Sequence, residues 1–121
     1  IGAHLPRPWF QTNDVERLPD ARHELVESLA VWLAGCELPV VLAGDLNSTD
    51  RGLDYRTLMT EGHLDDGMRT EWAGTTSTKW WPLLLRIDHI LTRGLCSVSA
   101  TNTDLPGSDH HSVIARLGEC E

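Results

Sequence analysis

The stretch PVVLAGDLN, residues 39–47, decides the fold of this 121-residue chain. It begins with a short apolar run, which is typical of a strand that is buried on both faces of a sheet. Gly44 then allows a close backbone approach, and Asp45 and Asn47 follow in the loop. A buried strand that ends in Gly-Asp-x-Asn brings a carboxylate and an amide to one edge of a sheet.

Two later stretches repeat this arrangement. RIDHIL, residues 86–91, carries polar groups inside a strand pattern, and SDHHSVI, residues 108–114, places an Asp-His pair directly before another strand. Residues 1–5 read as the tail of a strand, which the following prolines stop. Polar groups at the strand ends of layered α/β proteins converge into one crevice. The residues that we expect to meet there are His4, Asp45, Asn47, Asp88, Asp109 and His110.

One helix is predicted over residues 19–34, with a proline in its first turn and a glycine after its end. Its apolar stripe at the helical period consists of Leu25, Leu29, Trp32 and Leu33. We expect this stripe to face the core and Trp32 to be buried.

The remaining elements follow from shorter patterns. They are strands over residues 39–43, 86–92, 95–102 and 112–117 and a short helix around residues 53–59. Val98 and Ala100 are expected to share one face of their strand. Residues 67–85 have no clean period, which in compact domains marks a functional or mobile segment. Within them, Trp80 and Trp81 either stack on a base or sugar, or pack beneath the loop or against the surface of a missing partner.

The net charge of the chain disfavours one class of function. Ten Lys and Arg against 18 Asp and Glu give a formal net charge of −8. This charge disfavours a protein that binds nucleic acid non-specifically, because such a protein needs a basic face. It does not exclude an enzyme in which a divalent cation offsets a cluster of carboxylates. No apolar run approaches the roughly 18 to 20 residues that a membrane span needs.

The cysteines do not decide the compartment. Cys36, Cys96 and Cys120 are widely spaced, without the CxxC pattern of a zinc site. An odd count fits free thiols better than a full disulfide framework, so we expect buried or incidental cysteines, while one disulfide stays open as an alternative.

The carboxylates predict a metal site. Asp45, Asp88 and Asp109 would repel one another in one crevice unless a cation neutralised them. Mg²⁺ takes carboxylate oxygens, keeps some of its waters and binds phosphate oxygens, so we expect Mg²⁺ ahead of zinc, with Mn²⁺ as a substitute. His110 beside Asp109 indicates an imidazole that a carboxylate orients. We expect Asp45 and Asp109 to be metal ligands.

These segments, in this order, resemble the endonuclease/exonuclease/phosphatase superfamily, and the GDLN and SDHH segments are its most specific marks here. The resemblance covers the whole chain but only the C-terminal portion of the family domain. It implies an α/β fold, the C-terminal half of a four-layer α/β sandwich, with a mostly antiparallel sheet and helices on one face. It also implies a divalent-metal-dependent phosphoester hydrolase (a phosphodiesterase, nuclease or phosphatase) in which an activated water attacks in line.

The resemblance gives the residues of the GDLN and SDHH segments their roles. Asp45 would polarise or deprotonate the attacking water, and Asn47 would position that water and stabilise the transition state. His110 would hydrogen-bond the scissile phosphate, while Asp109 would hold its ring or contact the metal. The cation would act as a Lewis acid and stabilise the charge that develops on the phosphate.

Two further residues match the family pattern, and one part of that pattern is missing. The resemblance implies that Asp88 helps to orient the site and that His4 contacts the phosphate or assists the leaving group. The family also uses an early Asn and a metal-binding Glu, and neither lies upstream of His4 here. We therefore expect residues 1–121 to be a single partial domain that lacks the N-terminal half, with weak or absent activity alone.

The expected partners follow from that incompleteness. One is the N-terminal half itself, or a second copy of the chain paired through an exposed sheet edge. The other is a phosphoester substrate: a nucleic acid, a phosphoinositide or a phospholipid headgroup. An alternative hypothesis is a non-catalytic fragment or interaction module that keeps the motif residues but lacks a functional metal site. An unrelated α/β binding domain would require three ordered motif matches by accident.

Overall fold

The computed structural model describes residues 1–7, 18–69 and 85–121. Its elements are β1 (Gly2–His4), α1 (Leu18–Ala34), β2 (Val40–Asp45), α2 (Leu53–Thr60), β3 (Asp65–Asp66), β4 (Asp88–Arg93), β5 (Cys96–Thr103) and β6 (Ser112–Gly118). The predicted helix over residues 19–34 and the strands near residues 1–5, 39–43, 86–92, 95–102 and 112–117 are therefore confirmed. Trp80 and Trp81 lie outside the described residues.

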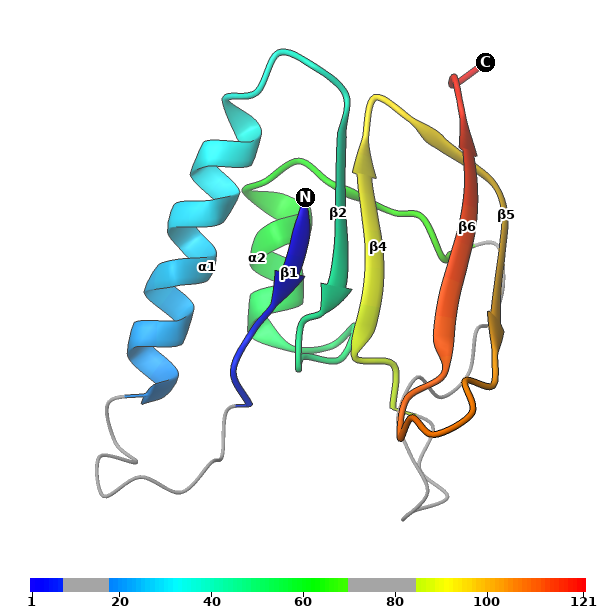
Figure 1. Cartoon of the computed structure of the whole chain (residues 1–121). Helices are drawn as coiled ribbons and strands as arrows, with labels where there is room; N and C mark the ends of the chain where they lie inside the picture. The colour runs from blue at the N-terminus through cyan, green and yellow to red at the C-terminus, as the bar shows by residue number, and fades with distance from the viewer. Residues whose placement is uncertain (8–17, 70–84) are drawn as a thin grey trace.

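The strands form a mainly antiparallel arrangement (Figure 1). Four of them make a sheet in the order β1-β2-β4-β3, and β5 pairs with β6. Only β1 and β2 run parallel among the described pairs, and the other pairs are antiparallel. Strand β6 lies beside β4, so the β5–β6 pair extends along the flank of the sheet opposite β1. The prediction of an α/β fold with mostly antiparallel strands is confirmed.

Both helices pack on one face of the four-stranded sheet, as predicted. A single apolar cluster joins Val26 and Leu33 of α1, Leu58 of α2, Leu42 of β2 and Leu91 of β4. Burial of these side chains is the main driving force that holds the helices to the sheet. Neither helix in the described part of the chain combines the length and apolarity that a membrane crossing requires.

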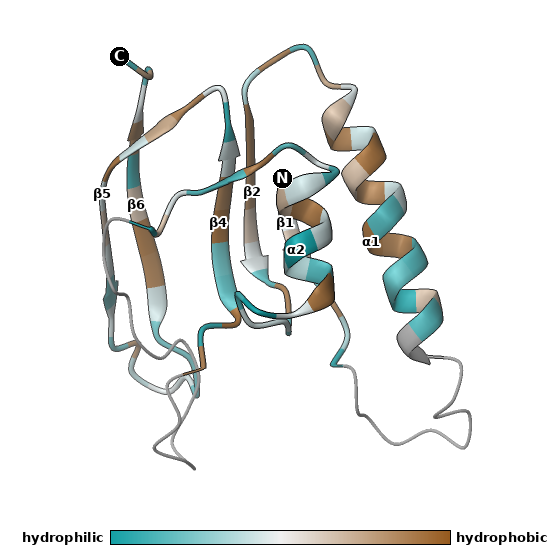
Figure 2. Cartoon of the chain, turned by 180° about the vertical axis from the view of Figure 1, so that it is seen from behind, coloured by the Kyte–Doolittle hydropathy of each residue, from teal (hydrophilic) through white to brown (hydrophobic). Residues whose placement is uncertain are grey.

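A second, smaller core lies on the other face of the sheet. It joins Met68, Ile90 and Ala100 and is flanked by the half-buried side chains of Val41 and Val113. Because side chains alternate along a strand, β2 and β4 contribute to both cores. Figure 2 shows β4 as hydrophobic in its middle and hydrophilic at its two ends. The polar lower end of β4 is where the candidate site lies.

The buried face of α1 differs from the predicted stripe. Trp32 is 59% exposed and Leu25 is 54% exposed, so the prediction that Trp32 is buried was wrong. The buried positions are Arg22, Val26, Ala30 and Leu33. These residues also recur at the helical period, but their stripe contains a charged residue, and a purely apolar criterion therefore selects the neighbouring stripe.

Two local features of the other strands were not predicted. Val98 is 53% exposed while Ala100 is buried, so the prediction that they share a face was wrong. The reason is an irregularity between Ser97 and Ser99, which breaks the alternation of side chains in β5. Asp65 and Asp66 form the short edge strand β3, which pairs with β4.

A disulfide joins Cys96, at the start of β5, to Cys120, just after β6. The expectation of incidental cysteines was therefore wrong for these two residues, and the alternative of one disulfide holds. Antiparallel pairing places Cys96 opposite Gly118, which brings the two cysteines together at the open end of the β5–β6 pair. Cys36 is a free cysteine.

The sheet register aligns polar residues from three strands. His4 pairs with Asp45 across β1 and β2, and Asp45 pairs with Asp88 across β2 and β4. Gly44 makes this close approach of β1 possible, because a Cβ atom at this position would lie 1.8 Å from the carbonyl oxygen of Ala3. Its φ of 147° also lies in the range that favours glycine. The fold therefore forms one row, His4–Asp45–Asp88, across the ends of three strands.

Candidate active site

His110 joins this row from the turn before β6. Pro106 and Gly107 form the centre of a turn in which Ser108 N–H donates to the carbonyl of Leu105 at 3.0 Å. Gly107 has a φ of 85°, as the third residue of such a turn requires. The hydroxyl of Ser108 then accepts the backbone N–H of His110 at 3.0 Å. This local structure directs the imidazole of His110 toward the end of β4.

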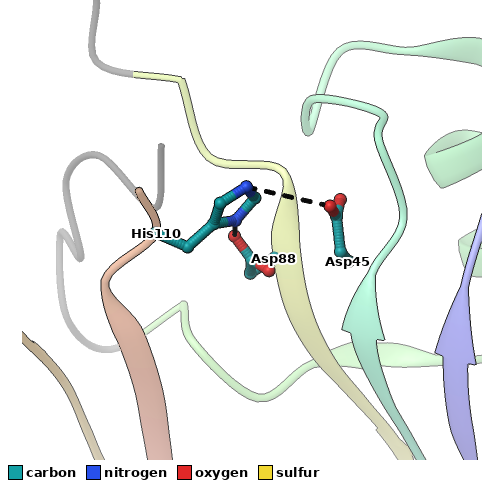
Figure 3. Close-up of side chains that lie close together, drawn as sticks. All are labelled: Asp45, Asp88 and His110. Atoms are coloured by element: carbon teal, nitrogen blue, oxygen red, sulfur yellow. Dashed lines mark hydrogen bonds and ion pairs between the residues drawn. The ribbon is translucent and has the colours of Figure 1, made fainter. Parts of the chain in front are cut away.

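Asp45, Asp88 and His110 form one compact group (Figure 3). Each offers one ligand atom, and these atoms all lie within 4.8 Å of one another. His110 Nδ1 lies 2.8 Å from Asp88 Oδ2, and His110 Nε2 lies 4.0 Å from Asp45 Oδ2. Since a carboxylate only accepts, Nδ1 carries the proton of the first contact. The other nitrogen, Nε2, therefore faces Asp45.

The two oxygens of Asp45 have different surroundings. Oδ1 accepts the backbone N–H of Asn47 at 2.7 Å. Oδ2 faces His110 Nε2 and lies 3.8 Å from His4 Nε2. The His4 side chain is 78% exposed, so it stands at the open rim of the group. Oδ2 of Asp45 is thus the oxygen that is directed toward the space between the two imidazoles.

Asn47 lies in the loop directly after β2, the strand that ends at Asp45. It is only 5% exposed, and its side-chain amide donates to the carbonyl of Leu5 at 2.7 Å. Its φ of 44° is the left-handed conformation, which asparagine tolerates better than most residues. This contact ties the end of β1 to the loop after β2. The predicted role of Asn47 in positioning a water remains a prediction.

Asp109 does not join the group. Its side chain is exposed, and the carboxylate that bonds to the His110 ring is Asp88. The group of ligand atoms that lie within 4.8 Å of one another contains no atom of Asp109. The structure thus brings together Asp45, Asp88 and His110, places His4 at their rim, and leaves Asp109 apart.

The donor set of this group fits a divalent cation. The carboxylates of Asp45 and Asp88 stand opposite each other in the sheet, where like charges repel unless a cation or an imidazolium lies between them. Carboxylate oxygens are the ligands that Mg²⁺ and Mn²⁺ prefer. Asp45 and Asp88 would hold such an ion, while His110 is already bonded to Asp88 and is better placed to contact a ligand of the ion.

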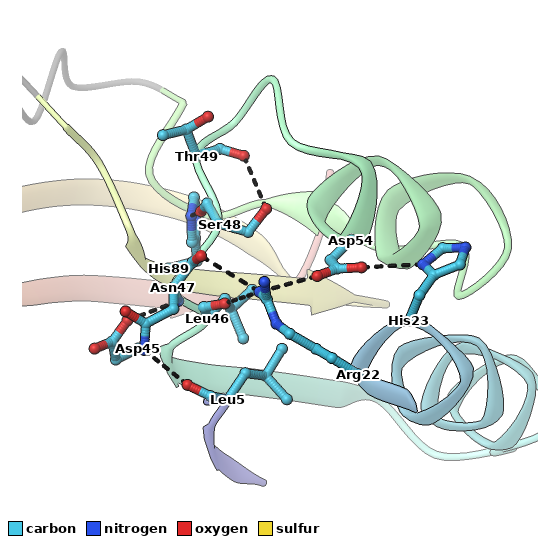
Figure 4. Close-up of polar contacts among 10 residues, drawn as sticks. All are labelled: Leu5, Arg22, His23, Asp45, Leu46, Asn47, Ser48, Thr49, Asp54 and His89. Atoms are coloured by element: carbon cyan, nitrogen blue, oxygen red, sulfur yellow. Dashed lines mark hydrogen bonds and ion pairs between the residues drawn. The ribbon is translucent and has the colours of Figure 1, made fainter. Parts of the chain in front are cut away.

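Buried polar side chains support the loop that carries Asp45 (Figure 4). Arg22 of α1 donates to the carbonyl of Leu46, and His89 of β4 donates from Nε2 to the carbonyl of Ser48 at 2.7 Å. Burial lowers the pKa of His89, so its ring is neutral and a single N–H serves this bond. Leu46 and Ser48 are therefore held by one helix residue and one strand residue, both on the helix-bearing face of the sheet.

A second polar cluster lies behind β4. Tyr55 donates its hydroxyl hydrogen to Asp66 Oδ2 at 2.9 Å, and Arg86 binds the same oxygen. Burial and the charge of Asp66 raise the pKa of Tyr55 to about 12. Burial alone would raise the pKa of Asp66, but the hydrogen bonds from Arg86, the Met68 N–H and Tyr55, together with the charge of Arg86, lower it by more, so the net shift of this pKa is downward. This cluster fixes Arg86 two residues before Asp88, and the Tyr55 ring packs on His89 at 4.9 Å between centroids.

The supporting residues Arg22, Asp54, Tyr55, Asp66 and His89 were not predicted from the sequence. One signal was present for Arg22, since it occupies the helical stripe of Val26, Ala30 and Leu33. A charged residue on such a stripe indicates a buried ion pair.

Comparisons with known proteins agree with the fold and with the family resemblance. Residues 3–110 match the endonuclease/exonuclease/phosphatase family. No curated protein matches the chain. Among solved structures, a 3′ phosphatase from Neisseria, bound to a product DNA hairpin, is similar over 97% of this chain and 60% of its own, with a TM-score of 0.72 and 18% identity.

Two Bacteroides proteins are also similar. An endonuclease/exonuclease/phosphatase from Bacteroides vulgatus matches 81% of this chain and 42% of its own, with a TM-score of 0.60 and 22% identity. A mannosyl-6-phosphatase from Bacteroides thetaiotaomicron matches 80% of this chain and 44% of its own, with a TM-score of 0.53 and 22% identity. The chain thus spans about 42 to 60% of the length of these structures. At this identity the likeness shows the fold alone.

Proposed function

Because the chain belongs to the endonuclease/exonuclease/phosphatase family, we propose that it provides one wall of the active site of a divalent-metal-dependent phosphoester hydrolase. The observation that carries this proposal is the Asp45–Asp88–His110 group, whose ligand atoms lie within 4.8 Å of one another at the ends of the strands. A cation bound there would act as a Lewis acid on a phosphate oxygen.

The chain's own residues divide the chemistry among them. Asp45 Oδ2 faces the open space between two imidazoles and would accept a hydrogen bond, or a proton, from the attacking water. Asp88 holds His110 Nδ1 at 2.8 Å and thereby fixes which nitrogen faces the site. His110 Nε2 would bond to a phosphate oxygen, and the Asp88 carboxylate would stabilise the imidazolium. Exposed His4 would meet the substrate at the rim.

The cation requires more ligands than this group offers. Mg²⁺ takes six, and two carboxylates leave places for water and substrate oxygens. In this proposal, further acidic ligands come from the other half of a whole family domain or from a second copy of the chain. Asp109 is retained as a candidate ligand only in such an assembly, because its side chain is exposed here.

The proposed substrate class is a phosphoester, of which a nucleic acid end, a phosphoinositide and a phospholipid headgroup are the candidates. The net charge of −8 disfavours long duplex DNA as a substrate of this chain alone. A nuclease and a phosphatase share the chemistry at phosphorus, so the group itself supports both.

Asp45→Asn and His110→Ala test the proposal in two assays. In the full-length protein, hydrolysis of bis(4-nitrophenyl) phosphate and of 4-nitrophenyl phosphate with Mg²⁺ should fall about 10²- to 10⁴-fold in each variant, because each removes a group that handles a proton or the phosphate. For the chain alone, binding of Mn²⁺, followed by water-proton relaxation, should weaken about tenfold or more in Asp45→Asn.

The matched control is Asp65→Asn, which removes an exposed carboxylate from β3. It should leave the hydrolysis rate and the Mn²⁺ affinity unchanged. Full hydrolytic activity in Asp45→Asn would overturn the proposal. Absence of Mn²⁺ binding and of hydrolysis in the wild-type full-length protein would instead support a non-catalytic interaction module.

A further inference from the structure

Arg22 is a buried cation directly behind the loop that carries Asp45. Its side chain is 7% exposed, and it reaches from α1 across the layer between helices and sheet (Figure 4). A guanidinium buried this deeply is costly unless its charge is paired and its donors are used. Asp54 of α2 supplies the countercharge at 2.9 Å. Its other oxygen bonds to His23 Nδ1 at 3.0 Å, which holds the Asp54 carboxylate in place.

One nitrogen of Arg22, Nη2, contacts the backbone of the loop. The guanidinium donates to the carbonyl of Leu46 at 2.6 Å and to that of Asn47 at 3.3 Å. Two consecutive carbonyls are therefore turned inward, away from the site. A third, that of Ser48, is taken by His89 from β4.

The first of these bonds bears directly on Asp45. The carbonyl of Leu46 and the N–H of Asn47 belong to one peptide unit, and all described peptide bonds are trans. In a trans unit the C=O and the N–H point in opposite directions. When Arg22 fixes the carbonyl inward, the N–H is directed outward, and it donates to Asp45 Oδ1 at 2.7 Å. That bond leaves Oδ2 directed toward His110.

We propose that Arg22 is a positioning residue of the site: through the single peptide unit between Leu46 and Asn47, it fixes the orientation of the Asp45 carboxylate. The inference rests on the proposed function only in taking Asp45 as a group that handles the reacting water or the cation. Arg22 itself does not touch the substrate space, because it lies beneath the loop.

The test compares Arg22→Met with Arg93→Met. Arg93 is a matched control, because it also donates to a backbone carbonyl, that of Cys36 at 2.6 Å, far from the site. The first readout is hydrogen exchange and the NMR shift of the Asn47 amide. In Arg22→Met this amide should exchange about tenfold faster or more, the effect of losing one hydrogen bond, and its shift should move toward that in Asp45→Asn. In Arg93→Met both should stay at wild-type values.

A second readout links the loop to the cation. Mn²⁺ affinity should fall about 10- to 100-fold in Arg22→Met, the range that is typical when a supporting partner of a ligand is lost, and should not change in Arg93→Met. If the wild-type full-length protein neither binds Mn²⁺ nor hydrolyses the phosphoesters, the proposed function fails, while the amide comparison still decides the role of Arg22. A merely structural role for Arg22 would lower stability without moving the Asn47 amide in the folded state.

Arg22→Lys keeps the test decisive if the Met variant does not fold. A lysine retains the charge beside Asp54, but it puts a compact ammonium in place of the planar guanidinium whose Nη2 reaches the carbonyl of Leu46. Faster exchange at Asn47, with wild-type exchange in α2, would support the proposal. A wild-type shift and exchange rate of the Asn47 amide in a folded Arg22 variant would overturn it.

Discussion

At the scale of single residues, the polar side chains that support the site are more deeply buried than those that form it. His89 is fully buried, whereas Asp45, Asp88 and His110 are half-buried. Its Nε2–H bonds to Ser48, and its ring packs against Tyr55. One residue of β4 therefore serves both the apolar layer and the loop after β2.

His89→Ala should destabilise the chain by about 2 to 4 kcal/mol, because it leaves a cavity and an unpaired buried carbonyl. The measurement is urea unfolding at pH 7.5. His89→Gln should lose less stability than His89→Ala, because the glutamine amide still offers a donor to the carbonyl of Ser48. The control is His63→Asn at an exposed position, which should be as stable as the wild type. Equal stability of His89→Ala and wild type would contradict the role of this contact.

The same residue sets the direction of one pH effect. Burial lowers the pKa of His89 below its ordinary value of 6.5, so the unfolded chain binds this proton more readily than the folded chain does. The contribution of His89 to stability is therefore greatest above pH 6.5 and is lost as the pH falls from there through the folded-state pKa. His23 acts in the opposite direction. Its hydrogen bond to Asp54 raises its pKa, so its contribution is complete below pH 6.5 and is lost as the pH rises.

At the scale of elements, the orientation of α1 about its axis is the main point on which sequence and structure differ. Leu25 and Trp32 fit an apolar stripe as well as Val26 and Leu33 do. The structure buries the second pair, and the same orientation places Arg22 beneath the loop after β2. Hydrophobic periodicity alone does not distinguish the two stripes.

Trp32→Gln and Leu33→Ala test this orientation on adjacent positions. The exposed Trp32 should tolerate the change within about 0.5 kcal/mol. Leu33 is fully buried, and its truncation should cost about 2 to 5 kcal/mol. The measurement is urea unfolding: the shift of the unfolding midpoint gives the change in stability of each variant, provided that the slope of the transition is the same as in the wild type. A larger loss of stability at Trp32 than at Leu33 would mean that Trp32, as predicted, rather than Leu33, is the more deeply buried of the two.

The positions of β2, β4 and β6 were predictable because local patterns determine them. Three strand ends carry the polar motifs, and the register then places His4, Asp45 and Asp88 in one row. The pairing of His110 with Asp88 rather than Asp109 was not predictable, since it depends on the path of the turn before β6. Arg22, His89 and the Cys96–Cys120 disulfide depend likewise on contacts between residues that are distant in sequence.

At the scale of the whole molecule, the disulfide between Cys96 and Cys120 spans a sequence separation of 24 residues. The closed segment contains β5, the turn with His110 and β6. It therefore connects the stability of the β5–β6 pair to the position of one member of the site.

Replacing both Cys96 and Cys120 by serine should lower the free energy of unfolding by about 3 kcal/mol, because the unfolded chain regains the freedom of an open loop of this size. Thermal unfolding, with and without reductant, measures the effect. Reductant should destabilise the wild type and leave the double variant unchanged. Cys36→Ser is the control, since this cysteine is free. A wild type that is insensitive to reductant would contradict this contribution.

The row His4–Asp45–Asp88 has a consequence for how the sheet assembles. A slip of one residue between β2 and β4 would bring Ile87 or His89 opposite Asp45 and turn the Asp88 carboxylate to the other face. The correct register instead places two like charges side by side, which opposes pairing. Packing of the apolar residues of β2 and β4 must therefore outweigh the repulsion between the two carboxylates. A cation that bridges the two carboxylates would remove this repulsion and stabilise the pairing of β2 with β4.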